Sequence, residues 1–398
     1  MRRFLKKLGQ VSIWDIGHLF LFFLALLPAG LLRKKRPHMW LICEYGQEAR
    51  DNGYWFYRYV RAEHPGQDIV YAITANAPDA KKVSGLGEAV GYGSFRHWIY
   101  YLAAEVNISS HKGGKPNAAV CYLLEVYGVL KNRRVFLQHG ITKDLAELFF
   151  YSNTKMRLFI CGAKPEYDYV CEKFGYPEGY VKYTGFARFD RLLEAHTVKN
   201  QVLLAPTWRR WLYEASSDPY NNSKKDLNQS EYVKAYQRLL RSSELERVLE
   251  ENGYELVFFP HRNMTSVFES GIETGKYIHI ENWKTRDLQE LLMESSCMIT
   301  DYSSTAMDFA YMDKPLVYYQ FDQERFRNEH FEEGYFHYER DGFGPVAKTE
   351  KELLSHLEQI LKDPVSAAEA YQKRIEAFFP LRDMKNSERI YQAVKDIL

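Results

Sequence analysis

Two histidines come directly after apolar runs that are typical of buried strands. His139 follows the run Val135–Gln138, and His261 follows the run Glu255–Phe259 and one proline. Side chains at the carboxyl ends of parallel strands gather at one edge of a sheet, where α/β proteins bind ligands. A neutral imidazole there can accept a proton from a hydroxyl group. Since a single histidine is more often structural than catalytic, the neighbouring polar residues must decide its role.

A second group of residues is suited to phosphate. Arg209 lies in the loop after an apolar strand at 202–205. Ser303 and Ser304 lie between the apolar run 297–299 and a helical pattern at 305–312. The unpaired N–H groups at a helix start favour phosphate, although serines at this position also simply cap helices. Both interpretations stay open on this pattern alone.

A third group lies in the loops expected after strands of the first half. Glu44 and Asn52 belong to a polar loop between the strand Trp40–Cys43 and the helix that follows it. Arg188 follows a strand predicted at 180–185. Loops of this kind form ligand sites in α/β folds, so we predict that these three residues serve the acceptor side of a site.

Strand and helix patterns alternate along most of the chain, which predicts parallel sheets. The helical stretches include 231–252, 365–378 and 386–397, and a polar loop is expected at 218–229. We predict a terminal segment at 1–37 and two Rossmann-like domains at 38–198 and 199–398. The two domains would face an interdomain cleft, on which both histidines and the phosphate group of residues would converge.

Composition excludes several classes of protein. The 398 residues are 46% hydrophobic and 26% charged, as in a globular protein, and the net charge of +1 gives no support for nucleic-acid binding. The five cysteines have no CxxC spacing. Because Cys43 and Cys297 lie in apolar runs, we expect reduced, buried thiols in a cytosolic compartment rather than disulfides or a zinc site.

The N-terminal segment is the only strongly apolar stretch with basic flanks. Residues 19–32 are almost wholly apolar, and basic clusters precede and follow them at 2–7 and 33–36. The run is short for a spanning helix, which needs about 20 apolar residues. A helix lying on the inner leaflet fits the length best, while a single span, a signal peptide and a core helix remain alternatives.

Several catalytic motifs are missing from the sequence. It contains no Gly-rich dinucleotide fingerprint, Walker A motif, HExxH, DxD triplet or G-x-S-x-G elbow. We therefore expect no cofactor and no built-in metal. The remaining histidines, arginines and hydroxyls can hold a diphosphate and accept a proton. This set points to transfer from a nucleotide-activated donor.

Seven segments resemble the CDP-glycerol:poly(glycerophosphate) glycerophosphotransferase family, the teichoic-acid polymerases and primases. They occur in the family's order and cover nearly everything from Met39 onward. The segments are WLICEYGQEARDNGYWFYRYV, FLQHGITKD, YTGFARFDRL, LLAPTWR, FFPHRN, ITDYSSTAMDFAYMDKPLVYYQFD and GFGPV. The resemblance implies a GT-B fold, association with the cytoplasmic face of a membrane, and a CDP-polyol donor.

The resemblance also implies roles for individual residues. His139 matches the family's catalytic base, and His261 matches a second essential histidine near the donor phosphates. The residues that match the donor and phosphate segments are Arg209, Arg262, Ser303, Ser304, Thr305 and Asp308. The family often has lysine five residues after the first histidine, whereas Lys143 here follows by four, so Lys143 receives no role.

These observations predict a transferase that moves a polyol phosphate to a membrane-linked teichoic-acid or capsule-type acceptor and releases CMP. CDP-glycerol is the favoured donor, and CDP-ribitol is not excluded. A GT-B glycosyltransferase that uses a nucleotide sugar is the alternative, and its product would be a nucleoside diphosphate and a glycoside. A non-catalytic membrane scaffold is disfavoured because both histidines and the Tyr-Ser-Ser turn are present.

Overall fold

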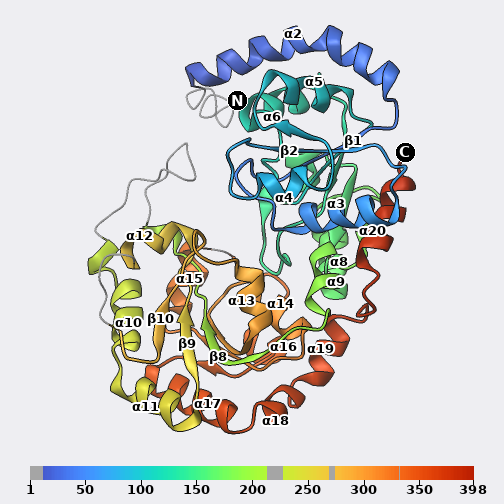
Figure 1. Cartoon of the computed structure of the whole chain (residues 1–398). Helices are drawn as coiled ribbons and strands as arrows, with labels where there is room; N and C mark the ends of the chain where they lie inside the picture. Colours follow the sequence, from blue (N-terminus) through green and yellow to red (C-terminus); the bar gives the residue numbers. More distant parts are fainter. Residues whose placement is uncertain (1–11, 213–226, 269–273, 331) are drawn as a thin grey trace. The chain divides into compact units, whose positions relative to one another are not determined.

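The computed structural model describes residues 12–212, 227–268, 274–330 and 332–398. The basic cluster at 2–7 and most of the polar loop predicted at 218–229 lie outside these residues. The chain divides into two compact units (Figure 1). Unit 1 contains the residues up to Ile141, Ala146–Arg191 and Leu381–Leu398, and unit 2 contains Thr142–Leu145 and Leu192–Pro380.

The sheet of unit 1 contains seven parallel strands in the order β3-β2-β1-β4-β5-β6-β7. The central strands are short apolar runs because helices cover both faces of a parallel sheet. This order places the carboxyl ends of β1, β4 and β5 next to one another. The strands are β1 Trp40–Cys43, β2 Ile69–Ile73, β3 Ala89–Gly91, β4 Val106–Ser109, β5 Arg133–Phe136, β6 Leu158–Cys161 and β7 Val181–Tyr183.

The helices of unit 1 begin mostly at polar caps, as the sequence patterns indicate. Asp51 accepts a hydrogen bond at the start of α3, and Ser94 and Asn117 cap α5 and α6. The helices are α2 Ile13–Lys35, α3 Asn52–Glu63, α4 Ala80–Ser84, α5 Phe95–Ala103, α6 Ala118–Val126, η1 Glu147–Phe149, α7 Tyr151–Thr154, α8 Lys164–Lys173, α9 Ala187–Leu192 and α20 Asn386–Lys395.

The C-terminal helix α20 belongs to unit 1, although the sequence placed it in the second domain. It packs against α3. The carboxylate of Asp190 accepts hydrogen bonds from the backbone N–H groups of Asn386 and Ser387, at 2.9 and 2.8 Å. The predicted second domain, 199–398, therefore extends too far: unit 2 ends at Pro380, and residues 381–398 belong to unit 1. The sequence did not show this because Asp190, which holds the helix, is almost 200 residues away.

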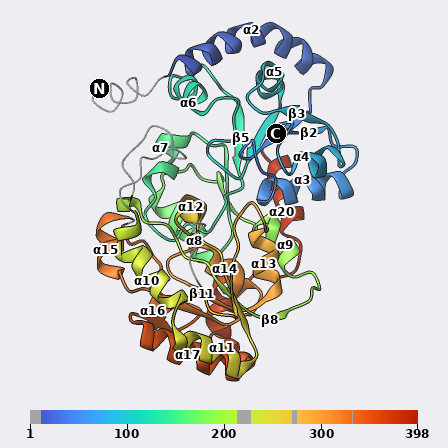
Figure 2. The same ribbon diagram turned by 60° about the vertical axis from the view of Figure 1, so that its left-hand side comes forward.

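The apolar helix α2 lies along α5 and α6 in both views of the chain (Figures 1 and 2). Its inner face contributes Phe22, Ala25 and Ala29 to the core of unit 1. Polar contacts fix it there: Trp98 donates its indole N–H to His18 Nδ1 at 3.0 Å, and Arg33 donates to backbone carbonyls of α5. The helix is long and apolar enough to cross a membrane, but it is docked on the unit along one face.

The sheet of unit 2 contains six parallel strands in the order β10-β9-β8-β11-β12-β13. Side chains of β8, β9, β11 and β12 form the core with α10, α11 and α17. The strands are β8 Lys199–Leu204, β9 Glu255–Phe258, β10 Ile278–Ile280, β11 Ser295–Thr300, β12 Leu316–Tyr319 and β13 Val346–Ala347.

Two helices predicted as single stretches in unit 2 are each broken in two. The stretch 231–252 breaks at 241–242, because Ser242 adopts an extended backbone and caps a new helix. The stretch 365–378 breaks between Glu369 and Gln372. The helices of unit 2 are η2 Arg210–Leu212, η3 Leu227–Gln229, α10 Glu231–Leu240, α11 Ser243–Asn252, η4 Arg262–Met264, α12 Thr265–Phe268, α13 Leu288–Glu294, α14 Thr305–Tyr311, α15 Gln323–Glu329, α16 Tyr338–Asp341, α17 Glu350–Lys362, α18 Pro364–Glu369 and α19 Gln372–Phe378.

The prediction of an α/β fold with two parallel sheets and an apolar N-terminal helix is confirmed. The buried state predicted for Cys43 and Cys297 is also observed, whereas Cys171 is exposed. All five cysteines are free thiols.

Candidate active site

His139 lies just beyond β5 in unit 1, as the strand pattern predicted. Gln138 takes a left-handed backbone conformation, with φ of 60°, and turns the chain sharply before the histidine. The Gln138 side chain is buried and accepts a hydrogen bond from the His139 N–H at 3.3 Å. His139 itself is exposed to solvent. The turn therefore presents the imidazole at the carboxyl edge of the sheet.

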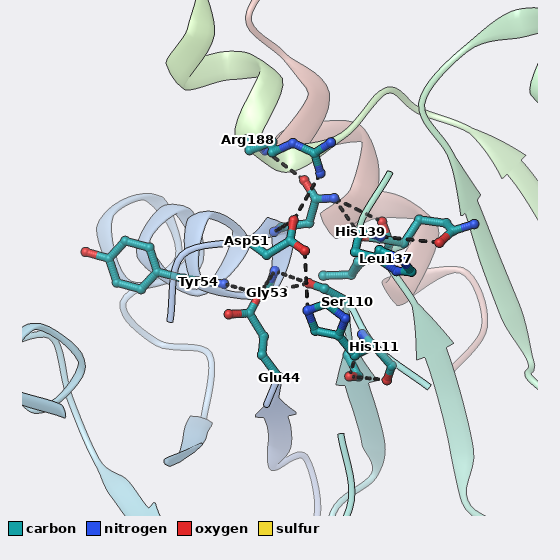
Figure 3. Close-up of polar contacts among 12 residues, drawn as sticks. Glu44, Asp51, Gly53, Tyr54, Ser110, His111, Leu137, His139 and Arg188 are labelled. Atoms are coloured by element: carbon teal, nitrogen blue, oxygen red, sulfur yellow. Dashed lines mark hydrogen bonds and ion pairs between the residues drawn. The ribbon is translucent and has the colours of Figure 1, made fainter. Parts of the chain in front are cut away.

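Glu44 is buried just beyond β1, where four donors surround its carboxylate; Gly53, Tyr54 and Ser110 are three of them (Figure 3). Oε1 accepts from the N–H groups of Gly53 and Tyr54 and from the hydroxyl of Ser110, at 2.8, 3.3 and 2.9 Å. Oε2 accepts from the Tyr71 hydroxyl at 2.8 Å. Burial raises the pKa of Glu44, and these hydrogen bonds favour the carboxylate. Only 2% of the residue is exposed, so Glu44 holds the start of α3 rather than contacting an acceptor.

Asn52 and Arg188 also lie inside unit 1. Asn52 donates to the carbonyls of Gln138 and Leu137 at 2.7 and 3.4 Å, and its own oxygen accepts from the Arg188 N–H at 3.1 Å. Asn52 thus links the start of α3, the loop directly before His139 and the start of α9. Both residues are buried and hold the loops of unit 1 together, so burial argues against direct contact with an acceptor.

The electrostatic surroundings favour a neutral His139. Desolvation and the positive charge of Arg188 lower the pKa of His139 below its ordinary value, and a hydrogen bond to the Ser110 carbonyl opposes this shift. The lowered pKa keeps the exposed imidazole unprotonated at neutral pH. An imidazole that is neutral at pH 7 can accept a proton.

Sequence reasoning missed two residues beside His139. The rings of His111 and His139 are stacked, with centroids 5.0 Å apart and planes inclined by 28°. His111 Nε2 lies 3.4 Å from a carboxylate oxygen of Asp51 (Figure 3). His111 stands two residues beyond β4, so the strand-end rule that identified His139 could also have identified His111.

Arg209 is fully buried in unit 2, where two carboxylates hold it. Its Nε and Nη2 donate to the two oxygens of Asp322 at 2.7 and 3.0 Å. Its Nη1 donates to Asp301 at 2.8 Å and to the Thr207 carbonyl at 2.7 Å. The guanidinium therefore joins the loops after β8, β11 and β12. A phosphate at the protein surface cannot reach it, so the predicted role in direct phosphate binding does not agree with its burial.

Asp301 extends this clamp to the turn that begins α14. Its Oδ1 accepts from the N–H groups of Thr207 and Tyr302, at 2.8 and 2.5 Å. The Tyr302 hydroxyl donates to Asp322 at 3.2 Å. Arg209 and the two carboxylates thus determine where the chain enters the Ser303–Thr305 turn. We define these three side chains as the Arg209 clamp.

The hydroxyl residues of the turn are half-buried and open to a ligand. Thr305 donates through Oγ1 to Ser303 Oγ at 2.8 Å, and the Thr305 N–H donates to the same oxygen at 3.3 Å. Ser304 occupies the cap position of α14 without a capping hydrogen bond from its side chain. Asp308 is buried on α14. Capping therefore does not consume the Ser304 hydroxyl.

His261 is the second predicted histidine, and it lies beyond β9 in unit 2. Its Nδ1 accepts from the Asn263 N–H at 3.2 Å, and its ring is tilted against Trp208 with centroids 6.2 Å apart. Burial and the charge of Arg262 lower the pKa of His261 to about 4. Arg262 lies over the Trp283 ring at 3.9 Å. Both His261 and Arg262 are half-buried, which leaves them able to meet a ligand.

Lys143, which had no role from the sequence, belongs to unit 2. It is buried and donates to Asp144 at 2.6 Å, and Arg327 donates to the other oxygen of Asp144 at 2.7 Å. Among the described residues, no group of three or more His, Cys, Asp or Glu side chains could hold a metal ion. The prediction that the site needs no cofactor remains a prediction.

Comparison with known proteins identifies the family of this chain. Residues 29–396 match the profile of the CDP-Glycerol:Poly(glycerophosphate) glycerophosphotransferase family. The chain belongs to this family. The match covers both units and the C-terminal end of α2, from residue 29 to Lys35, so the resemblance seen in the seven sequence segments is confirmed.

Two relatives of this chain come from Bacillus subtilis (strain 168). The minor teichoic acid biosynthesis protein GgaB is 30% identical over 374 residues, which are 91% of this chain and 40% of GgaB. The teichoic acid poly(glycerol phosphate) polymerase is 28% identical over 202 residues, 49% of this chain and 24% of the polymerase. The matched regions are thus less than half of either relative.

A solved structure shares the fold of this chain. The wall teichoic acid polymerase TagF, in a structure soaked with CDPG, superposes with a TM-score of 0.64 at 17% identity. The superposition covers 91% of this chain and 89% of that chain. The predicted GT-B-like architecture is therefore confirmed.

Proposed function

We propose that this chain transfers a polyol phosphate from a CDP-activated donor to a hydroxyl group of a teichoic-acid or capsule-type acceptor and releases CMP. The family match over residues 29–396 carries this proposal. The exposed imidazole of His139 at a sheet edge supplies the group that the reaction needs. Glycerol phosphate is the favoured unit because both Bacillus subtilis relatives act in teichoic acid synthesis and one is named for glycerol phosphate.

The proposed reaction is a direct displacement at phosphorus. His139 takes the proton of the acceptor hydroxyl, and the oxygen forms a bond to the β-phosphorus of the donor. The bond between the β-phosphorus and the bridging oxygen breaks, and CMP leaves with the electron pair. The imidazolium of His139 then returns its proton to solvent. A neutral His139 is required at the start, in agreement with its lowered pKa.

Unit 2 supplies the candidates for donor binding. His261, Arg262 and the hydroxyls of Ser303, Ser304 and Thr305 are half-buried rather than sealed in the core. Positive charge and hydrogen-bond donors of this kind neutralise a diphosphate as negative charge develops on CMP. The Arg209 clamp holds the chain where it enters the Ser303–Thr305 turn.

We also propose that α2 lies on the cytoplasmic face of the membrane, where the acceptor would be presented. Its inner face is already packed on unit 1, and removing it to span a bilayer would expose Phe22 and the indole of Trp98. Its last turn carries Arg33, Lys34 and Lys35, which favour anionic lipids. The large side chains exposed on the helix are Trp14, Ile16, Leu19, Phe20, Phe23, Leu24, Leu26, Leu27 and Leu31.

The decisive experiment is incubation of the chain with CDP-glycerol or CDP-ribitol, with and without a lipid-linked teichoic-acid acceptor. We expect CMP and a new phosphodiester, with CDP-glycerol as the better donor. A His139→Ala protein with an unchanged unfolding midpoint is the matched control, and it should release no CMP above background. Release of a nucleoside diphosphate from a nucleotide sugar, with no CMP from either polyol donor, would instead establish the glycosyltransferase alternative. No turnover and no binding of either CDP-polyol would favour a scaffold.

A further inference from the structure

Three aromatic rings form a stack along the carboxyl edge of the unit 1 sheet. The rings of Tyr45 and His111 have centroids 4.0 Å apart and planes inclined by 30°. The next pair, His111 and His139, has centroids 5.0 Å apart. The three residues follow β1, β4 and β5, which are neighbours in the sheet. His111 is therefore the middle ring, with Tyr45 on one side and His139 on the other.

His111 is fixed by contacts independent of the stack. Its Nε2 lies 3.4 Å from Asp51 Oδ2, and only 14% of its side chain is exposed. Its N–H donates to Ser109 Oγ at 3.0 Å, and that hydroxyl donates to the His111 carbonyl at 2.6 Å. Asp51 is itself held by the Arg188 guanidinium at 3.0 Å. The middle ring thus has little freedom to turn.

His139 has weaker support of its own. It is exposed. The contacts to its ring are the Ser110 carbonyl, the His111 face and the edge of Phe149, with centroids 6.2 Å apart for the last pair. An exposed side chain held at one atom can rotate, whereas one packed against a fixed ring cannot do so freely.

We propose that His111, held by Asp51, is a positioning residue that fixes the imidazole of His139 for proton transfer. One ring nitrogen of His139 donates to the Ser110 carbonyl, which leaves the other nitrogen to accept the proton of the acceptor hydroxyl. In the described part of the chain the two imidazoles are in ring contact and share no hydrogen bond, so His111 acts through orientation and not as a second base. This inference rests on the proposed function of His139.

Three charged groups lie near the pair. Asp51 and Arg188 face His111, and Glu44 lies behind Ser110. Desolvation lowers the pKa of His111 well below its ordinary value, as do the charges of His139 and Arg188. Both rings are therefore neutral at pH 7, which suits a stack in which His139 accepts a proton.

The test compares His111→Ala, which removes the ring, with His111→Phe, which keeps a ring but removes both nitrogens. Misplacing a reacting group by about 1 Å costs about 100-fold in rate. We therefore expect His111→Ala to lower kcat by 10- to 100-fold, with KM for CDP-glycerol unchanged, and His111→Phe to recover most of this loss. The Ala variant must first be shown to be folded by its unfolding midpoint.

A second readout needs no substrate. The histidine signals of the intact chain, followed by NMR against pH, report the pKa of His139. With the middle ring removed, water reaches His139 more fully, so its pKa should rise toward the ordinary value in His111→Ala and stay low in His111→Phe. If the wild-type chain turns over no CDP-polyol, the proposed function fails, while this titration still decides the positioning role.

Three results would overturn the inference. The first is a His111→Ala protein with wild-type kcat. The second is a folded His111→Phe protein as slow as His111→Ala, which would show that a ring nitrogen of His111 takes part in the chemistry. The third is a His139 titration that His111→Ala does not change.

Discussion

The Arg209 clamp provides the sharpest test of how unit 2 is built. Replacing Arg209 by methionine keeps most of the side-chain volume but removes the charge between Asp301 and Asp322. Breaking a buried ion pair by removing one partner costs about 3–5 kcal/mol, because it leaves a buried charge without compensation. Asp301 keeps its two backbone N–H donors, so we expect the lower end, about 3 kcal/mol.

This cost converts into a measurable shift. In a domain of 150–250 residues, 1 kcal/mol lowers the unfolding midpoint by roughly 2–4 °C. The transition of unit 2 should therefore move down by roughly 6–12 °C in Arg209→Met. Because the clamp sets the path of the chain into the Ser303–Thr305 turn, affinity for CDP-glycerol should fall as well. Arg209→Lys keeps the charge but not the two-pronged geometry, and it should lie between wild type and Arg209→Met.

The assay pairs thermal unfolding with calorimetric binding of CDP-glycerol well below the midpoint. Leu249→Ala is the matched control, because Leu249 is fully buried on α11 and its loss costs about 2–5 kcal/mol without touching the clamp. We expect the control to lose stability but keep its donor affinity. Arg209→Met with a wild-type midpoint would refute the reasoning. So would a variant that binds CDP-glycerol weakly yet unfolds at the wild-type midpoint, since that pattern indicates direct phosphate contact.

Three further predictions concern unit 1. Burial lowers the pKa of His97 to about 3, so as the pH falls below about 6.5 the unfolded chain binds a proton that the folded chain does not, and the folded state loses stability. At pH 5 this loss is about 2 kcal/mol. His97→Gln should therefore flatten this part of a plot of unfolding midpoint against pH. The double variant Phe23→Asp, Leu27→Asp removes two exposed apolar side chains of α2, so its affinity for anionic vesicles, measured by flotation, should fall about 100-fold or more. The control Val365→Asp, on α18, should bind the vesicles like wild type. Asn52→Ala leaves the carbonyls of Leu137 and Gln138, just beyond β5, without the hydrogen bonds of the Asn52 amide. The loop before His139 should shift, so kcat should fall by about 100-fold while KM for CDP-glycerol stays unchanged. A fall in affinity for CDP-glycerol alone would contradict the role of Asn52 in holding this loop.

Sequence patterns predicted the sheets well because parallel strands buried on both faces read as uninterrupted apolar runs. The strand Trp40–Cys43 agrees residue for residue, and His139 was found because it ends such a run. The break at Ser242 was missed because only two residues separate α10 from α11. The apolar positions of α11 therefore continue the helical spacing of α10 almost in phase. Its signal was a serine two residues before an acidic side chain, a common start of a helix.

The sequence could not separate residues that touch a ligand from those that hold them. Arg209 and its partner Asp322 are 113 residues apart, and nothing local to LLAPTWR predicts that the guanidinium faces inward. Glu44 looks like a ligand-site carboxylate in its loop, yet its four donors come from α3, β2 and the loop after β4. Burial depends on these distant partners. The position of a residue at a strand end therefore predicts that it lies near the site, but not whether its side chain faces a ligand or the core.

Burial divides the predicted site residues by role. The ionic groups with the most hydrogen bonds, Glu44 and Arg209, are sealed inside their units, where an unpaired charge would be costly. The groups that remain open, such as His139 and the Ser304 hydroxyl, carry no strong ion pair of their own. Buried charge therefore fixes the loops, and weakly held neutral groups are left free to meet substrate. If this division is correct, charge-preserving substitutions should be harmful at the buried positions, whereas at the open ones loss of a single hydroxyl or imidazole should change kinetics with little change in stability.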